Sequence, residues 1–198
     1  MAATLRRKWL IAVALVSMST AAVAGDCHET FVIDSVEYDI PARWCGRKLD
    51  STQIADKTCL VRLPGELCFE DYRIYVMPPA RDAFVKMAAA AKKAGLSLRV
   101  DSGYRSAEFQ KKIIKKRLQA GEKYERMVRM VAPPGYSMHQ TGCAFDLVPS
   151  EARFVKTDQY RWLKENARKF GFTEPIPENN SDSLFWEPYH WFYNSKAE

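Results

Sequence analysis

The sequence predicts an α+β domain in which helices flank a central antiparallel sheet. Segments with helical spacing and short β-like segments follow one another without strict alternation and without an internal repeat. This order favours an α+β fold over a parallel α/β fold. The length of 198 residues, with 47% hydrophobic and 12% aromatic residues, fits one small globular domain and excludes a disordered chain.

The first 24 residues have the pattern of a signal peptide. A positive segment, Arg6-Arg7-Lys8, precedes an apolar run from Trp9 to Val16, and Ala22-Val23-Ala24 forms an A-x-A cleavage site. The apolar run is too short to span a bilayer comfortably. We therefore expect cleavage before Gly25, export to a periplasm or to the medium, and no stable membrane insertion.

Five cysteines in an exported chain predict disulfides. Four lie early in the mature chain and one lies apart, namely Cys27, Cys45, Cys59, Cys68 and Cys143. Three pairings of the early four are possible, and the sequential one (27 with 45, 59 with 68) closes the smallest loops. Cys143 stands in an apolar run and is expected to be a buried free thiol. The chain thus divides into a signal peptide (1–24), a disulfide-bearing N-terminal extension (25–77) and a main domain (78–198).

Local patterns predict the elements in order. Residues 31–33, 36–40 and 72–76 of the extension have β character. Pro78-Pro79 introduces a helix over 80–94, and alternation with period two predicts a strand over 96–100. Ser106 is a candidate N-cap for a helix that ends near residue 120. An apolar strand over 143–148, a helix over 158–170 followed by Gly171, and a β-like tail over 185–193 complete the domain.

The net charge of the mature chain is weak. Removing the leader leaves 27 basic and 24 acidic residues, a net charge of +3, which is too weak on its own to argue for nucleic acid as a partner. A nucleic-acid binder would rest only on the basic segment that follows, so we expect no nucleic acid. Eight basic residues gather in one segment: Lys111, Lys112, Lys115, Lys116, Arg117, Lys123, Arg126 and Arg129. Such a helix face is either a solvated surface or attracts an anionic polymer such as a cell wall. We expect a monomer.

Two of the three histidines lie in segments typical of a hydrolytic metal site. His139 and Asp146 are seven positions apart across a glycine-bearing turn, and His190 lies in an aromatic segment near the C-terminus. Two imidazoles and one carboxylate can hold zinc and leave its fourth position open to water. His28, beside Cys27, is expected to be incidental.

Three further residues complete the expected chemistry. Glu187, three positions before His190, is the candidate general base that takes a proton from water and passes it to the leaving amine. Because the two side chains would point to opposite faces of a regular strand, we expect a bend at Pro188. Arg105 can bind a carboxylate or a developing oxyanion, and Ser137 can donate a hydrogen bond to substrate.

Three motifs in this order resemble a known family. They are Ser102-Gly103-Tyr104-Arg105-Ser106-x-x-x-Gln110, then Pro134-Gly135-x-Ser137-x-His139-Gln140-x-Gly142-x-Ala144-x-Asp146, and then Glu187-x-x-His190-Trp191. Together they resemble the VanY-like zinc D-alanyl-D-alanine carboxypeptidases, within the group that includes lysostaphin-type peptidases and the hedgehog signalling domain. The resemblance covers about residues 78 to 193 and leaves most of the extension unexplained.

The resemblance implies both a site and a substrate. Zinc would be held by His139, Asp146 and His190, with Glu187 as base and Arg105 in substrate or transition-state binding. The substrate pocket would include Gln110, Ser137 and Trp191. The substrate would be the peptide stem of peptidoglycan, from which a terminal D-alanine is removed. Met138 and Cys143 depart from the usual pattern, where an acidic residue and a leucine are common; the first bears on substrate choice and the second leaves zinc binding untouched.

Two other functions remain open at this point. The first is a peptidoglycan endopeptidase, which would cut within a stem or cross-bridge. The second is a zinc-bearing cell-wall binding module without turnover, although such a site has no need of a base at Glu187. Neither the choice between a D,D and an L,D bond nor the oligomeric state follows from the sequence.

Overall fold

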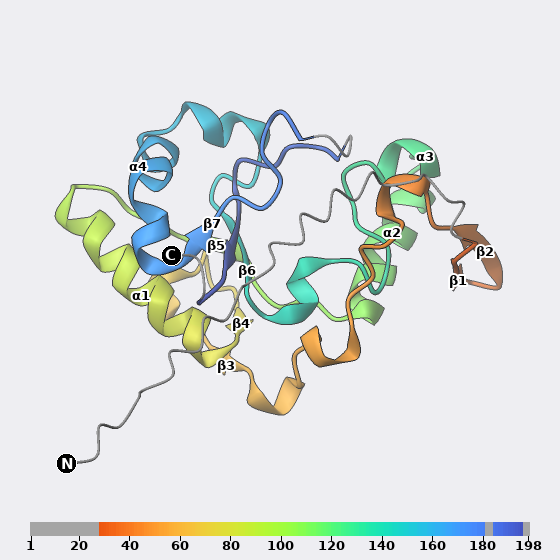
Figure 1. Ribbon diagram of the computed structural model, residues 1–198, viewed down its shortest axis with the longest axis horizontal. Coiled ribbons are helices and arrows are strands. Elements are labelled where there is room, and N and C mark those ends of the chain that lie inside the picture. Colours follow the sequence, from red (N-terminus) through yellow and green to blue (C-terminus); the bar gives the residue numbers. More distant parts are fainter. Residues whose placement is uncertain (1–27, 181–183, 196–198) are drawn as a thin grey trace, which may run out of the picture.

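The computed structural model describes residues 28–180 and 184–195, so the predicted signal peptide and Cys27 lie outside the described residues (Figure 1). Its largest sheet has four strands in the order β5-β6-β8-β7. The strands are β5 Val100–Ser102, β6 Ala144–Leu147, β7 Phe172–Thr173 and β8 His190–Tyr193. All three pairings are antiparallel. The predicted α+β class with an antiparallel sheet is confirmed.

Helices lie on two sides of this sheet. In Figure 1, α1 (Pro78–Lys93) and α4 (Asp158–Asn166) lie on one side of it, and α2 (Ala107–Gln119) and α3 (Tyr124–Met127) lie on the other. The side chain of Phe84 on α1 is fully buried, and its ring stacks on Phe145 of β6 with centroids 5.0 Å apart. This contact anchors β6, the strand that carries Asp146, to the main hydrophobic core.

The helix ends follow the sequence signals. The Ser106 hydroxyl accepts a hydrogen bond from Phe109 N at 3.1 Å, which makes it the N-cap of α2 as expected. Thr157 caps α4 in the same way. The predicted helix over 158–170 is α4 continued by a 3-10 turn, Ala167–Phe170, and it ends at Gly171, whose φ is 78°.

Two strands are shifted from their predicted positions. The alternation over 96–100 does bury Leu98 and Val100, but pairing with β6 begins only at Val100, so β5 lies later in the chain than expected. In the tail, only His190–Tyr193 forms a strand, because Pro188 and Tyr189 make a turn. Burial alternates as expected over residues 96–100 but not over the tail, where His190 and Trp191 are both buried. Strand pairing depends on partners that are distant in sequence.

The first part of the described chain is tied to the main domain through two cores. Its strands are β1 Thr30–Ile33, β2 Val36–Asp39, β3 Val61–Arg62 and β4 Tyr75–Val76, joined by short 3-10 turns. The β1–β2 hairpin packs near α2 and α3 in a second core that includes Phe31, Trp44, Ile114 and Tyr136. The Trp44 Nε1–H donates to Val128 O at 2.7 Å. This segment is therefore integrated with the domain that follows it.

The expected pairing of Cys59 with Cys68 is wrong, since both are free thiols. Cys68 is fully buried, with its Sγ directed at the carbonyl oxygens of Leu63 and Pro64, whereas Cys59 lies exposed on a different 3-10 turn. Cys143 is also a free thiol, half-buried rather than fully buried. The pairing of Cys27 with Cys45 stays a prediction, because Cys27 lies outside the described residues.

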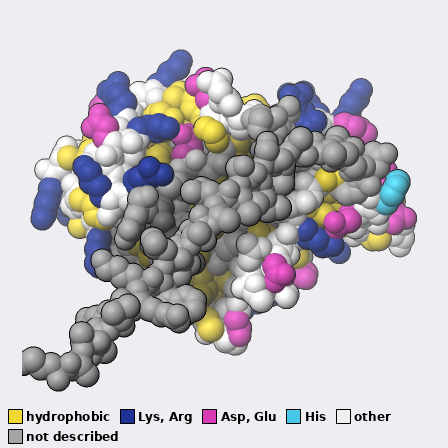
Figure 2. Space-filling view, in the orientation of Figure 1, with side chains coloured by type: hydrophobic (Ala, Val, Ile, Leu, Met, Phe, Trp, Pro, Cys, Tyr) yellow, Lys and Arg dark blue, Asp and Glu magenta, His cyan; other side chains and the backbone are white. Residues whose placement is uncertain are grey.

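Charged side chains of both signs share the surface. On the face shown in Figure 2, Lys and Arg side chains form separate groups with Asp and Glu between them. Two members of the basic segment on and after α2 are paired: Lys115 with Asp34 at 2.7 Å, and Arg117 with Glu122 at 2.6 Å. Among the described helices, none has both the length and the apolar character needed to cross a membrane.

Candidate metal centre

The three predicted ligands come together from three parts of the chain. Asp146 on β6 and His190 on β8 are directly opposite each other in the antiparallel ladder. His139 lies on a 3-10 turn, Met138–Thr141, that ends at Gly142 with a φ of 68°. A side chain at position 142 would be strained and would press on Met77 N, 3.3 Å from its Cβ. This glycine therefore permits the tight turn that leads from His139 into β6.

The ligand atoms have the spacing of a metal site. His139 Nε2 lies 3.1 Å from Asp146 Oδ2, and His190 Nδ1 lies 2.8 Å from Asp146 Oδ1. One donor atom from each of the three side chains lies within 4.8 Å of the other two. Two ligands about 2.0–2.2 Å from a tetrahedral zinc ion would be about 3.4 Å apart. The three buried side chains thus match the size and donor chemistry of a zinc site.

His139 is held in the tautomer that a metal requires. Its Nδ1 lies 2.5 Å from Gly103 O, so the Nδ1–H donates to this carbonyl and Nε2 keeps its lone pair. Within the described residues, Nε2 is buried and makes no hydrogen bond. Burial, and then the positive charge of Arg105, lower the pKa of His139 to about 4. The neutral imidazole presents an unused acceptor to the centre of the site, and this orphaned atom fits a metal ligand.

Asp146 is ionised in this setting. Burial opposes its charge, but His139, His190 and the guanidinium of Arg105 outweigh that effect and hold its pKa well below the ordinary value. Arg105 Nη2 lies 3.5 Å from Asp146 Oδ2. A carboxylate that remains charged while buried is suited to a divalent cation, which would provide the compensating charge.

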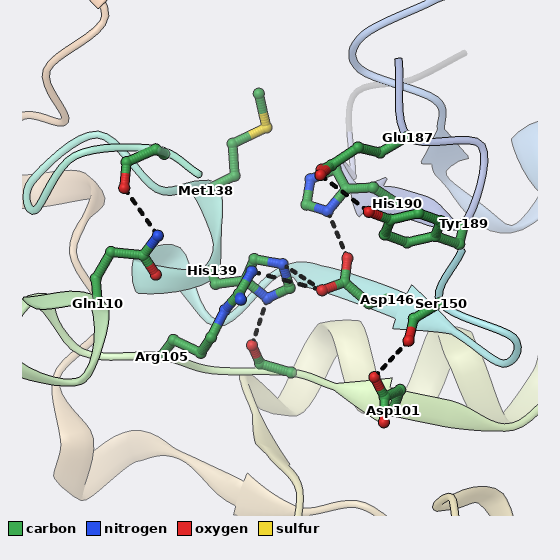
Figure 3. Close-up of polar contacts among 12 residues, drawn as sticks. Asp101, Arg105, Gln110, Met138, His139, Asp146, Ser150, Glu187, Tyr189 and His190 are labelled. Atoms are coloured by element: carbon green, nitrogen blue, oxygen red, sulfur yellow. Dashed lines mark hydrogen bonds and ion pairs between the residues drawn. The ribbon is translucent and has the colours of Figure 1, made fainter. Parts of the chain in front are cut away.

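Glu187 stands next to this centre on the turn that precedes β8. His190 N donates to Glu187 O at 2.9 Å across Pro188 and Tyr189, so the expected bend at Pro188 is present. Both Glu187 and His190 line the same cavity. Burial raises the pKa of Glu187, and the Tyr189 hydroxyl donates to its Oε1 at 3.0 Å (Figure 3). A carboxyl whose pKa is raised above its ordinary value is suited to proton transfer.

The cavity around the centre has a volume of about 510 Å³. Arg105, Gln110 and Ser137 all line it, together with the three ligands and Glu187. Gln110 Nε2 donates to Ala132 O at 2.8 Å, whereas its Oε1 is buried without a partner among the described residues. The Nε of Arg105 is likewise buried and unpartnered there. These two groups are available to a ligand that enters the cavity.

Trp191 is not placed at the cavity. Its side chain is 2% exposed and belongs to the main hydrophobic core, and its Nε1–H donates to Pro188 O at 3.1 Å. The alternation of β8 explains the difference: His190 faces the cavity, so its neighbour Trp191 faces the opposite side of the sheet. Trp191 supports the turn that presents Glu187 and does not itself reach the site.

The cavity also includes residues that were not singled out from the sequence, among them Asp101, Ser150 and Tyr189. Asp101 directly precedes the first motif and Tyr189 is a variable position within the third, and these positions were the only sequence signal for them. Ser150 had none, since it follows β6 in a segment without a recognisable pattern. A more open hollow of about 780 Å³ between β3 and α1 is lined by none of the metal-centre residues.

Comparison with known proteins finds relatives that are described as carboxypeptidases. Residues 73–196 match the family model described as VanY: D-alanyl-D-alanine carboxypeptidase. The chain is 36% identical over 142 residues to the putative carboxypeptidase YodJ of Bacillus subtilis, a match that covers 66% of this chain and 51% of that protein. The chain thus spans about half the length of this curated relative.

Solved structures that resemble this chain include peptidases. An LD-carboxypeptidase, LdcB, superposes with a TM-score of 0.65 at 29% identity and covers 84% of each chain. A variant of the vancomycin resistance D,D-pentapeptidase VanY in complex with Zn(II) gives a TM-score of 0.50 at 27% identity, covering 67% of this chain and 82% of that one. The family match extends over more than half of the sequence and includes every residue of the metal centre. The chain belongs to the VanY family of D-alanyl-D-alanine carboxypeptidases.

Proposed function

We propose that this protein is an exported, zinc-dependent carboxypeptidase that removes a C-terminal D-alanine from peptidoglycan stem peptides. One observation carries the proposal: His139, Asp146 and His190 converge in a cavity whose wall also presents Glu187. A binding module would need the three ligands but no buried carboxylate beside them. The export signal is the predicted leader, and the relatives that share this fold include a protein described as recognising peptidoglycan.

The proposed site divides the chemistry among named residues. When bound by His139, Asp146 and His190, zinc would polarise the scissile carbonyl and lower the pKa of water. Glu187 would accept the proton of the attacking water and pass it to the leaving amine. Burial raises the pKa of Glu187, which favours its protonated form and so assists it in taking up and returning that proton. Tyr189 would keep the carboxylate aimed into the cavity through its hydrogen bond.

Arg105 favours an exopeptidase over an endopeptidase. Its guanidinium lines the cavity next to the ligands, and its Nε has no partner among the described residues. A substrate that ends at the site offers a free carboxylate to such a cation, whereas an internal peptide bond does not. Gln110 and Ser137, on the same wall, would contribute polar contacts to the substrate.

The direct test is release of D-alanine from synthetic stem tetrapeptides and pentapeptides. We expect release by the zinc-loaded protein, loss of release with a chelator, and a fall in kcat of about 10²-fold or more in Glu187→Gln. Glu165→Gln, which alters an exposed glutamate on α4, serves as the matched control. Internal fragments in place of shortened stems would indicate an endopeptidase. Binding of zinc and stem peptides without any cleavage would indicate a wall-binding module.

A further inference from the structure

Asp101 is an acidic residue of the cavity that has no role in the proposed hydrolysis. It lies on β5, one residue before Ser102. Its Oδ2 accepts a hydrogen bond from the Ser150 hydroxyl at 2.6 Å, and it forms no ion pair within residues 28–180 and 184–195. Both residues line the same cavity as the metal centre. The cavity therefore contains a carboxylate whose only side-chain partner among these residues is neutral.

The basic residue nearest to Asp101 in sequence, Arg99, contacts other groups. Arg99 Nε donates to Cys68 O at 3.0 Å, and its guanidinium carbon lies 6.0 Å from the centre of the Phe69 ring. Three arginines line the cavity: Arg105, Arg117 and Arg129. Arg105 contacts Asp146, and Arg117 is paired with Glu122. None of them forms an ion pair with Asp101. Asp101 therefore has no ion pair with any arginine of the cavity and can pair with a cationic group of a ligand.

The position of Asp101 indicates which part of a substrate it would meet. In the view of Figure 3, Arg105 and the Asp101–Ser150 pair lie to either side of Asp146. If Arg105 takes the terminal carboxylate, the opposite side of the centre receives the residue that supplies the scissile carbonyl. Tyr72, which lines the cavity and is 47% exposed, offers an aromatic face that suits a cation.

We propose that Asp101 is a specificity-determining residue that binds a primary ammonium group on the side chain preceding the scissile bond. The preferred substrate would then end in a diamino acid followed by D-alanine, an inference that rests on the proposed function. Ser150 occupies Oδ2 and leaves Oδ1 available. A single available oxygen suits a point-like ammonium better than a guanidinium, which prefers both carboxylate oxygens.

The test compares two peptides of equal length that differ only in one charge. One ends in lysine–D-alanine and the other in norleucine–D-alanine, and kcat/KM is measured for each with the zinc-loaded protein. We expect the lysine peptide to be favoured about tenfold, as a charge-assisted hydrogen bond would give. In Asp101→Asn, which keeps an acceptor for Ser150, the ratio should fall close to one.

A matched control removes the same charge outside the cavity. Glu151 is exposed, adjoins Ser150 in sequence and is paired with Arg153 on the surface. Glu151→Gln should retain the ratio of the unaltered protein. This control separates a specific contact from a general change in the electrostatic field, which would affect both variants alike.

Two results would overturn the inference: equal kcat/KM for both peptides in the unaltered protein, or an unchanged ratio in Asp101→Asn, including one in which kcat/KM falls equally for both peptides. The last would mean that Asp101 only supports the local structure. If no peptide is cleaved at all, the proposed function fails, and the inference is then decided by calorimetry. Affinities of the two peptides for Glu187→Gln, with and without Asp101→Asn, should show the same tenfold preference and its loss.

Discussion

Asp146 and His190 are direct partners across the β6–β8 ladder, with His190 Nδ1 2.8 Å from Asp146 Oδ1. The separation of these two ligands is therefore set by backbone hydrogen bonds of a sheet rather than by a loop. His139 joins them from a turn whose imidazole is fixed by Gly103 O. A site built on rigid elements in this way is preorganised for its ligand and needs little rearrangement on binding.

Zinc should stabilise the folded protein through these three side chains. At a free zinc concentration of 100 times Kd, the free energy of unfolding should rise by about 2.7 kcal/mol, because the ion binds only the folded state. Thermal unfolding with and without zinc measures this gain. Asp146→Ala should lose it, whereas Asp82→Ala, at an exposed carboxylate on α1, should keep it. A full zinc shift in Asp146→Ala would contradict the assigned centre.

Removing the hydrogen bond to the base should alter the pH dependence of activity. The Tyr189 hydroxyl stabilises the charged form of Glu187, so Tyr189→Phe should raise the Glu187 pKa further. The acidic limb of the kcat profile should then move to higher pH, since the base is lost as pH falls through its pKa. Tyr193→Phe, on β8, is the comparison variant. An unshifted acidic limb in Tyr189→Phe would show that this hydroxyl does not tune the base.

The zinc-free protein should lose stability in mild acid. The pKa of His139 is 6.5 when unfolded and about 4 when folded, so the unfolded chain binds more protons between these values. The free energy of unfolding should fall by about 3 kcal/mol as pH decreases from 6.5 to 4. Denaturant titrations in the presence of a chelator would measure this. His139→Gln should flatten the decline, whereas His28→Gln, at an exposed position, should leave it in place.

Gly103 should tolerate no side chain. A Cβ there would lie 2.7 Å from Ile74 Cγ2 and 2.8 Å from Tyr75 O, so Gly103→Ala forces the strand ends apart. We expect a loss of about 1–3 kcal/mol in unfolding free energy and weaker zinc binding, because the carbonyl that orients His139 moves. Gly65→Ala, where a Cβ would meet nothing within 4 Å, should have little effect on either. Equal stability of the two variants would show that the close packing at Gly103 has no such consequence.

The sequence was most informative where local chemistry decides the structure. Ser106 as an N-cap, Gly171 after the helix and the bend at Pro188 each depend on a few neighbouring residues, and each is present. The ligands could be found because two imidazoles and a carboxylate are uncommon together in recognisable motifs. Their convergence is a property of strand pairing, which no local pattern encodes.

The residues that the sequence did not place correctly depend on contacts between segments that are distant in the chain. Trp191 was assigned to the pocket from its motif, yet its direction depends on which face of β8 His190 takes. Cys59 and Cys68 are near in sequence, but burial of the second among Leu63 and Pro64 separates their thiols. Asp101 could not be selected because only the folded cavity shows that its carboxylate has a neutral hydrogen-bond partner, Ser150, and no ion-pair partner among the described residues.

Trp44 carries a consequence for any shortened version of this protein. Its indole is bonded to Val128 O, and Trp44 and Tyr136 both line the cleft. The family match begins only at residue 73, well after this tryptophan. A fragment cut to the family boundary would keep all three predicted metal ligands but lose Trp44 and Tyr72 from the lining of the cavity. Such a fragment should still bind the metal, but its substrate selectivity should differ from that of the full chain.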